Sequence, residues 1–422
     1  MIPKFSAEVH RAFAALQAAL DGLRLVPDDV VLVACSGGAD SLALAVATAK
    51  AAQRVGRTTR QKGFRVRAGA IIVNHNLHLD AAAVAAKAAA TCRQIGLDPV
   101  IVKSVNVEQH SPDGLEAAAR AARYQAFAAA AAETGAKSIL LGHTMDDQAE
   151  SVLLGLARGS GARSLAGIAP RRFQPNPVIP SAPNCSTNQR QPRDAGLTRN
   201  PTIGQPSSAD KPNAGNIQYL RPFLRVRRRT TEEICHLFNL TPWHDPTNYL
   251  PTTHTEADPA RDIPTRTHVR AIAIPAISSA IGHDVIPALA RTADLLRDDA
   301  DALDQYAADL FHQAQREADP SPSGTLAIPP LPTVPGPSSA LNLDIAVLTA
   351  APKAVRTRAL RLALLQLGIR ADAATRALVL ALDALVTDWH GQGDVFLPGG
   401  IIARRNGGIL SFDLSAAGPV RQ

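Results

Sequence analysis

The first half of the chain alternates short apolar runs with longer stretches of helical periodicity. Apolar runs at 30–35, 68–75, 99–105 and 138–143 are each followed by an alanine-rich or amphipathic stretch. Strand and helix alternating at this spacing predict a parallel β-sheet with helices on both faces. Because ligands of such sheets bind beyond the carboxyl ends of the strands, we expect the functional residues where the apolar runs end.

The second half of the chain is less regular. The stretch from 171 to about 216 is rich in Pro, Asn, Ser, Thr, Gln and Arg, which predicts a disordered insertion, and a shorter irregular stretch covers about 250–265. A helical segment with leucines every seven residues follows, and then a Pro-rich linker. We therefore predict an α/β domain over 1–275 with both insertions, a connecting helix and linker over 276–340, and a small, mostly helical C-terminal domain over 341–422.

The basic charge of the chain is concentrated in one region. Lys and Arg number 44 against 37 acidic residues, which gives a net charge of +7 and a pI near 9.5. Between 171 and 229 there are eleven basic residues and two acidic ones, Asp194 and Asp210. A small positive excess often serves solubility alone, but a concentrated one attracts polyanions. The distribution therefore favours a nucleic acid partner.

Cysteine usage and hydropathy indicate a protein of the reducing cytoplasm. The four cysteines are scattered without a CxxC pair, so we expect no structural metal. No apolar run reaches the roughly 18 residues of a membrane span, and the first residues lack the pattern of a cleaved signal. We expect no membrane partner and a cytoplasmic location.

A glycine-containing loop follows the first apolar run directly. Residues 36–41 read SGGADS and lead into the next helical stretch. Two glycines allow a sharp turn that aims backbone N–H groups at an anion, and the start of a helix adds partial positive charge. Glycine turns capped by serine are common without any ligand, but the preceding strand and the following Asp-Ser make this string more specific. The lysine of a Walker loop is missing, which disfavours chemistry of that kind.

Two pairs of charged residues stand at helical spacing near other strand ends. Arg120 and Arg123 share a helical face and could hold a phosphate, although alone they read more simply as solvated arginines. His143 ends the fourth apolar run, and Asp147 and Glu150 lie three apart on the next helix. That spacing places both carboxylates on one face, where they could hold an ammonium group or Mg²⁺. An acidic first turn often only compensates the helix dipole.

The SGGADS loop resembles the pyrophosphate loop (PP-loop) of the ATP pyrophosphatases, which split ATP between the α and β phosphates. Further stretches are similar to the tRNA(Ile)-lysidine synthetases within that superfamily. They are 115–124, 140–151, 158–161, 220–224 with Arg227 and Glu232, 244–248, Arg266, Arg270 and 389–400. One stretch departs from the family: many members read VDHGLR where this chain has Asn74, His75, Asn76, Leu77 and His78.

The resemblance implies a ligase that forms a C–N bond. ATP and Mg²⁺ would activate a cytidine of tRNA-Ile with a CAU anticodon, and L-lysine would then replace AMP. The first domain would be the catalytic PP-loop domain and the last a tRNA-binding domain. The implied ATP-binding residues are Ser36, Gly37, Gly38, Ala39, Asp40, Ser41, His75 and Arg120. Asp40, Arg123, His143, Asp147 and Glu150 would be catalytic, with Asp40 near Mg²⁺ and Asp147 and Glu150 binding lysine.

Two alternatives stay open from the sequence. A PP-loop tRNA thiolase would use similar ATP chemistry but commonly carries paired cysteines, which this sequence lacks. A non-catalytic tRNA-binding protein of the same fold would keep basic patches and lose polar site residues, whereas this chain retains them. The oligomeric state is left open, with a homodimer among the options.

Overall fold

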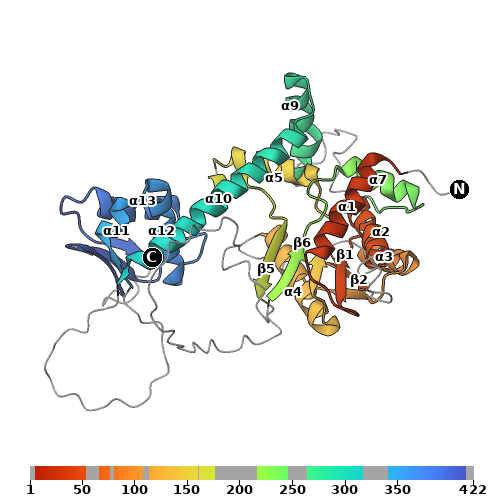
Figure 1. The fold of residues 1–422 in the computed structure, drawn as a ribbon, viewed down its shortest axis with the longest axis horizontal. Coiled ribbons are helices and arrows are strands. Elements are labelled where there is room, and N and C mark those ends of the chain that lie inside the picture. The colour runs from red at the N-terminus through yellow and green to blue at the C-terminus, as the bar shows by residue number, and fades with distance from the viewer. Residues whose placement is uncertain are drawn as a thin grey trace, which may run out of the picture. The chain divides into compact units, whose positions relative to one another are not determined.

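The computed structural model describes residues 5–53, 66–76, 80–107, 114–159, 161–175, 216–245, 264–316 and 341–414 (Figure 1). The chain divides into two compact units, Met1–Arg297 and Asp298–Gln422. The division falls within the long helix α10 (Ile286–Ala314), which corresponds to the predicted connecting helix. The Pro-rich linker predicted after this helix lies outside the described residues.

The first unit is built on a six-stranded sheet. Its strands are β1 (Val30–Ala34), β2 (Arg67–Asn74), β3 (Val100–Ser104), β4 (Ser138–Leu140), β5 (Arg171–Pro175) and β6 (Asn216–Leu220). The strand order is β3-β2-β1-β4-β6-β5, and all neighbours are parallel except β5, which runs antiparallel to β6 at the edge. The predicted parallel α/β fold is confirmed.

Both ends of the predicted insertion form strands. Arg171–Pro175 is β5 and pairs along its whole length with β6, which starts at Asn216. The pairing is stabilised because Ile217 and Tyr219 on β6 are buried, so the edge of the sheet has an apolar face to cover. The rest of the insertion, 176–215, lies outside the described residues.

Helices cover both faces of this sheet. The helices of the first unit besides α10 are α1 (Ala7–Asp21), α2 (Ala39–Ala52), α3 (Ala81–Ile95), α4 (Leu115–Thr134), α5 (Met145–Ala157), α6 (Ala162–Leu165), α7 (Arg228–Leu237), α8 (Thr265–His268), the π-helical turn η3 (Val269–Ala273) and α9 (Ile274–Ile281). The residues of β1 alternate between two cores: Val31 and Val33 pack with α1, α2 and α3, and Val30 and Leu32 pack with α4. Figure 1 shows α1, α2 and α3 together beside β1 and β2.

The strand order places a crevice between β1 and β4. The chain passes from β1 to β2 and β3 on one side and then returns to β4 on the other side of β1. Adjacent connections therefore leave the sheet on opposite faces at this point, and the carboxyl ends of β1 and β4 are where ligands of such folds bind. The SGGADS loop follows β1, and the stretch with His143, Asp147 and Glu150 follows β4.

The second unit has its own core and a small antiparallel sheet. Its strands are β7 (Gln315–Arg316), β8 (Leu341–Asp344), β9 (Val395–Leu397), β10 (Ile401–Asn406) and β11 (Ile409–Leu414), in the order β7-β8-β11-β10-β9. The helices α11 (Ile345–Ala350), α12 (Lys353–Gln366) and α13 (Arg376–Thr387) pack on it. A buried ion pair of 2.6 Å, from Arg356 Nε to Asp383 Oδ1, joins α12 to α13.

Among the described helices, none is by itself long and apolar enough to cross a membrane. The bent pair Thr265–Ile281 and Ile286–Ala314 meets the length and composition criteria only when both parts are taken together.

Candidate functional site

The loop after β1 presents open backbone donors at the start of α2. Gly37 has a φ of +85°, and Gly38 is the N-cap of α2 without any side-chain capping bond. The first N–H groups of the helix have no intrahelical acceptor, so they are available to an anion. Space beside the loop is tight, because a Cβ on Gly142 would lie 3.1 Å from the backbone of Asp40. Glycine at that position lets β4 approach the loop.

The two serines of the loop hold its shape. The Ser41 hydroxyl donates to the Gly38 carbonyl over 2.9 Å and accepts the Ser36 N–H over 3.1 Å. The Gly37 carbonyl accepts the backbone N–H of Trp243 over 2.9 Å, which ties the loop to the segment after α7. These bonds fix the turn in a shape ready for a phosphate group.

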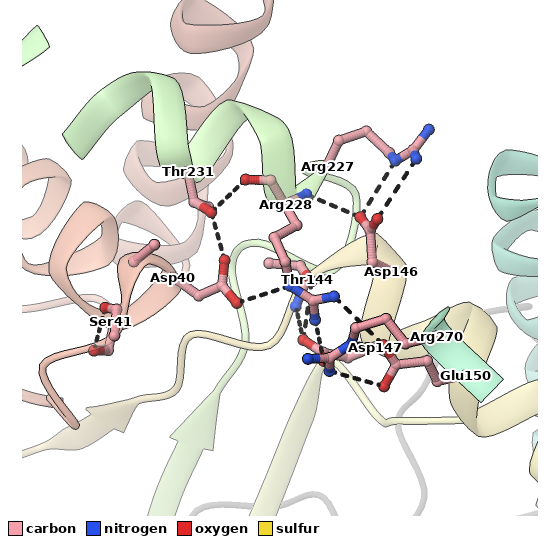
Figure 2. Close-up of polar contacts among 12 residues, drawn as sticks. Asp40, Ser41, Thr144, Asp146, Asp147, Glu150, Arg227, Arg228, Thr231 and Arg270 are labelled. Atoms are coloured by element: carbon pink, nitrogen blue, oxygen red, sulfur yellow. Dashed lines mark hydrogen bonds and ion pairs between the residues drawn. The ribbon is translucent and has the colours of Figure 1, made fainter. Parts of the chain in front are cut away.

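Three carboxylates from the ends of β1 and β4 converge on one arginine, Arg228 (Figure 2). Arg228 Nε lies 3.4 Å from Asp40 Oδ2, Nη2 lies 2.7 Å from Asp147 Oδ1, and Nη1 lies 3.4 Å from Glu150 Oε1. Thr231, one turn along α7, donates its hydroxyl to the other oxygen of Asp40. The structure thus brings together three residues that the sequence analysis selected, around one that it did not.

Asp147 and Glu150 are held on the same face of α5, as their spacing predicts. Asp147 Oδ2 accepts the backbone N–H and the hydroxyl of Thr144, over 2.7 and 2.9 Å, in a capping box at the start of the helix. Glu150 is fully buried and accepts two bonds from Arg270, over 2.7 and 3.2 Å. Arg266 approaches Glu150 to 3.9 Å. Both arginines come from α8 and η3.

A second acidic group joins this network at the start of α7. Asp146 Oδ2 accepts the backbone N–H of Arg228 over 2.9 Å and forms an ion pair with Arg227, which also contacts Asp284. The connected network contains Asp40, Asp146, Asp147, Glu150 and Asp284 together with Arg227, Arg228, Arg266 and Arg270. Five carboxylates against four guanidinium groups leave one formal negative charge among these described residues. One further cation would neutralise it.

The carboxylates differ in their affinity for protons. Burial raises the pKa of Asp40 to about 6, and the nearby charge of Asp147 adds to this rise while Arg228 opposes it. Burial also acts on Asp147, but the charge of Arg228 and the bonds from Thr144 outweigh it and lower the pKa below its usual value. Of the two, Asp40, beside the phosphate loop, is therefore the carboxylate that binds a proton more readily.

The two histidines near the strand ends are neutral at neutral pH. Burial lowers the pKa of His143 to about 4, with Arg221 and Arg120 adding to the effect and Asp147 opposing it. Burial and the charge of Arg123 likewise lower the pKa of His75 to about 4. Each imidazole can therefore donate one N–H and accept one bond but does not supply a positive charge.

Arg120 and Arg123 diverge although they lie one turn apart on α4. The Nε of Arg123 donates to His75 Nε2 over 3.2 Å, which places it at the end of β2. Arg120 lies over the ring of Tyr124, 5.2 Å from its centroid. The altered stretch after β2 makes a tight turn in which Asn74 Oδ1 accepts the N–H of Asn76 over 3.0 Å. Leu77 and His78 lie outside the described residues.

The described residues offer few groups for binding a metal ion or for thiol chemistry. No group of three or more His, Cys, Asp or Glu side chains there suits a metal ion. The carboxylate best placed to share a Mg²⁺ ion with phosphate groups is Asp40, because it lies on the first turn after the loop. Cys35, Cys92 and Cys235 are free and buried, so their thiols are not exposed to a ligand at the surface.

Arg228 is the central residue that the sequence analysis missed. A local signal was present: three arginines, 227 to 229, stand at the start of α7, where the helix dipole disfavours positive charge. Such an unfavourable run indicates that an acidic group lies close by in the fold. The identity of that group could not be read from the sequence, because Asp40 is 188 positions away.

Comparison with known families assigns both units. Residues 6–254 match the model described as PP-loop domain, and residues 343–410 match the model described as TilS substrate binding domain. The chain is 41% identical over 386 residues to a tRNA(Ile)-lysidine synthase of Thermobifida fusca, covering 91% of this chain and 92% of the relative. It is 40% identical over 389 residues to a tRNA(Ile)-lysidine synthase of Streptomyces coelicolor, covering 92% of this chain and 86% of the relative.

Among solved structures, the chain overlaps with the U34-tRNA thiolase NcsA from Methanococcus maripaludis. The overlap covers 69% of this chain and 80% of that chain, with a TM-score of 0.45 and 13% sequence identity.

Proposed function

The chain belongs to the tRNA(Ile)-lysidine synthase family, and on that premise we propose that it joins L-lysine to C2 of a cytidine in the CAU anticodon of tRNA-Ile. The protein is a ligase that forms a C–N bond with ATP. The observation that carries the proposed chemistry is the carboxylate network beside the phosphate loop, with its single uncompensated negative charge. The thiolase and the non-catalytic alternatives are not favoured.

The proposed reaction has two steps. The C2 oxygen of cytosine attacks the α phosphate of ATP, the bond between the α and β phosphates breaks, and pyrophosphate leaves. The neutral ε-amine of lysine then attacks C2, AMP leaves with the former C2 oxygen, and the amine loses a proton. Activation must precede substitution because the C2 oxygen is a poor leaving group on its own.

In the first step the N–H groups at the start of α2 would bind the β and γ phosphates. Mg²⁺, held by Asp40 and the phosphates, would neutralise charge on the leaving pyrophosphate. Arg123, already turned toward His75 at the end of β2, would donate to phosphate oxygens or the nucleotide. His143, neutral and half-buried just after β4, would donate one N–H rather than a charge.

In the second step the network would hold the lysine side chain. Asp147 and Glu150 both pair with Arg228 and Arg270, but among the described residues the five carboxylates of the network exceed its four guanidinium groups by one. An ammonium group beside Asp147 and Glu150 would offset that excess negative charge. The lowered pKa of Asp147 suits it to hold an ammonium group and makes it a weak acceptor for the proton.

The second unit and the location complete the proposal. Residues 343–410 match a substrate-binding domain, and we assign to this unit contacts with the body of the tRNA. The substrates proposed here, tRNA, ATP and free lysine, occur together in the cytoplasm, where we place the reaction.

The products of the reaction test the function directly. Incubation with ATP, labelled lysine and a tRNA-Ile transcript carrying CAU is expected to give AMP, pyrophosphate and a lysine-modified cytidine in equal amounts. Chromatography of the nucleotides and mass analysis of digested RNA measure them, with a transcript carrying a GAU anticodon as control. Formation of ADP and phosphate, or modification without lysine, would contradict the assignment.

Glu150→Gln tests the lysine site separately from the ATP site. The change keeps the shape and removes a buried charge that Arg270 and the ammonium share, so the KM for lysine is expected to rise about ten- to a hundredfold. Pyrophosphate release from tRNA and ATP without lysine should change much less. Glu133→Gln removes an exposed carboxylate in the last turn of α4, paired with Lys103, and is the matched control. A loss of pyrophosphate release with an unchanged lysine KM would move Glu150 to the ATP site.

A further inference from the structure

A pocket of about 370 Å³ lies beside the carboxylate network, and arginines dominate its lining. Its charged lining residues are Arg120, Arg158, Arg172, Arg221 and Arg266, and no acidic residue lines it. They come from α4, the end of α5, β5, the turn after β6 and α8. We propose that this pocket binds phosphate groups of the RNA substrate, next to the nucleotide that reacts. The inference rests on the proposed function, since it takes a tRNA as the substrate.

The positive charge of this pocket lacks a counterpart in the described part of the protein. The arginines of the carboxylate network are paired, whereas of the five that line the pocket only Arg266 lies near a carboxylate there, at 3.9 Å. Arg221 is buried, its Nη1 donates to the Ala169 carbonyl over 2.7 Å, and its Nη2 lies 3.4 Å from the Tyr124 hydroxyl. Its Nε is buried without a hydrogen-bond partner. A buried guanidinium left without an anion is costly, which indicates a site prepared for one.

The wall of the pocket is fixed before any ligand arrives. The buried Gln148 side chain accepts the Ile168 N–H over 2.6 Å and donates to the Ile168 carbonyl over 3.3 Å. Gly167 has a φ of +63°, and a Cβ there would lie 2.6 Å from Gln148 Oε1. The loop after α6 can therefore pack against Gln148 only with glycine at this position. A preformed wall lowers the entropy cost of binding.

The position of the pocket favours RNA over ATP as the source of phosphate, although the family resemblance assigns one of its arginines, Arg120, to ATP. None of the residues 36–41 of the phosphate loop lines it. It touches the carboxylate network instead, because Arg266 lines the pocket, approaches Glu150 and lies 3.5 Å from the Ser151 hydroxyl. A volume of this size accommodates a nucleotide, and Leu154 and Ile168 offer apolar contact for a sugar or base. A phosphodiester bound here would deliver the adjoining base toward the lysine site.

The double variant Arg158→Gln and Arg172→Gln tests the pocket, because both side chains are exposed and their loss should not affect folding. An RNA hairpin with a CAU loop is expected to bind about a hundredfold more weakly, as two charged hydrogen bonds are lost. The slope of log K against log salt should fall by about two. The dissociation constant of ATP alone should be unchanged. Fluorescence anisotropy of the labelled hairpin measures its affinity and salt dependence, and a nucleotide-binding titration measures the affinity for ATP.

The double variant Arg93→Gln and Arg291→Gln is the matched control, because it removes the same charge from exposed positions on α3 and α10. It should change hairpin affinity less than threefold, as expected for distant screened charges. Equal weakening by both pairs, or an unchanged affinity of the pocket variant, would overturn the proposal. Weaker ATP binding with normal hairpin binding would assign the pocket to ATP and overturn it as well. Lysine transfer by the parent protein is measured beside these assays. If the parent transfers no lysine, the proposed function is rejected. If the parent transfers lysine but the pocket variant binds the hairpin normally, only this inference is rejected.

Discussion

Replacing Arg228 by alanine is expected to lower the stability of the first unit by about 3 kcal/mol, the lower end of the cost of breaking a buried ion pair. The side chain contacts Asp40, Asp147 and Glu150 at once and is 19% exposed. Its removal leaves one buried and two half-buried carboxylates facing one another without the charge that separates them (Figure 2). Trp243 reports on the phosphate loop, so its fluorescence during unfolding in a Trp389→Phe background follows the first unit alone.

The stability lost in the Arg228→Ala variant should increase as the pH rises. Arg228 lowers the pKa of both Asp40 and Asp147, so without it both values should rise, that of Asp40 further above the value of the unfolded chain. A carboxyl with a raised pKa contributes stability that is full below the unfolded pKa, about 4, and lost as pH rises through the folded value. The difference in unfolding free energy between the parent and the Arg228→Ala variant should therefore be small near pH 4 and largest above about pH 7.

Arg229→Ala is the control for this prediction. Arg229 stands next to Arg228 on the same helix, but its ion pair with Glu8 is on the surface and its side chain is 66% exposed. Exposed pairs contribute about 0 to 1 kcal/mol. An Arg228 variant that unfolded like the Arg229 variant at neutral pH would show that the network does not depend on this guanidinium.

Asp40→Asn is expected to lower the rate of pyrophosphate release at least a hundredfold, the scale typical of losing one electrostatic group in an active site. The carboxylate lies on the first turn after the phosphate loop, and burial raises its pKa to about 6. Its pKa of about 6 also predicts a pH dependence of the reaction with ATP. In the parent, kcat/KM for ATP should fall about tenfold per pH unit below that value, because this ratio reports the free enzyme. In the Asp40→Asn variant, this fall of kcat/KM at acidic pH should be absent.

The same variant should be more stable than the parent above neutral pH. A folded pKa raised from the usual 3.8 to about 6 means that the ionised carboxylate opposes folding there, by about 3 kcal/mol. Asp294→Asn, which removes a carboxylate from an exposed ion pair with Arg225, is the control. It should change neither the rate of pyrophosphate release nor the stability. A folded Asp40→Asn protein with the parent rate would remove Asp40 from the mechanism.

The fold and the phosphate loop could be predicted from the sequence because their determinants are local. Apolar runs alternating with helical stretches specify β1 to β4 and the helices between them, and a Gly-Gly turn before a helix has few conformations open to it. The shared face of Asp147 and Glu150 also follows from helical spacing alone. Edge strand β5 was missed because its apolar partner, β6, lies 40 or more positions further along the chain.

Which cation meets which carboxylate was decided by the tertiary structure. Arg228 reaches Asp40, 188 positions away, only because α7 packs beside α2, and Arg270 reaches Glu150 only because η3 lies against α5. The pKa values near 6 and 4 depend on burial in a crevice that several segments close together. The arginine pocket likewise collects side chains from five separate elements. Sequence patterns extend over a few turns of chain, whereas charge pairing and desolvation depend on distances in space, which packing alone determines.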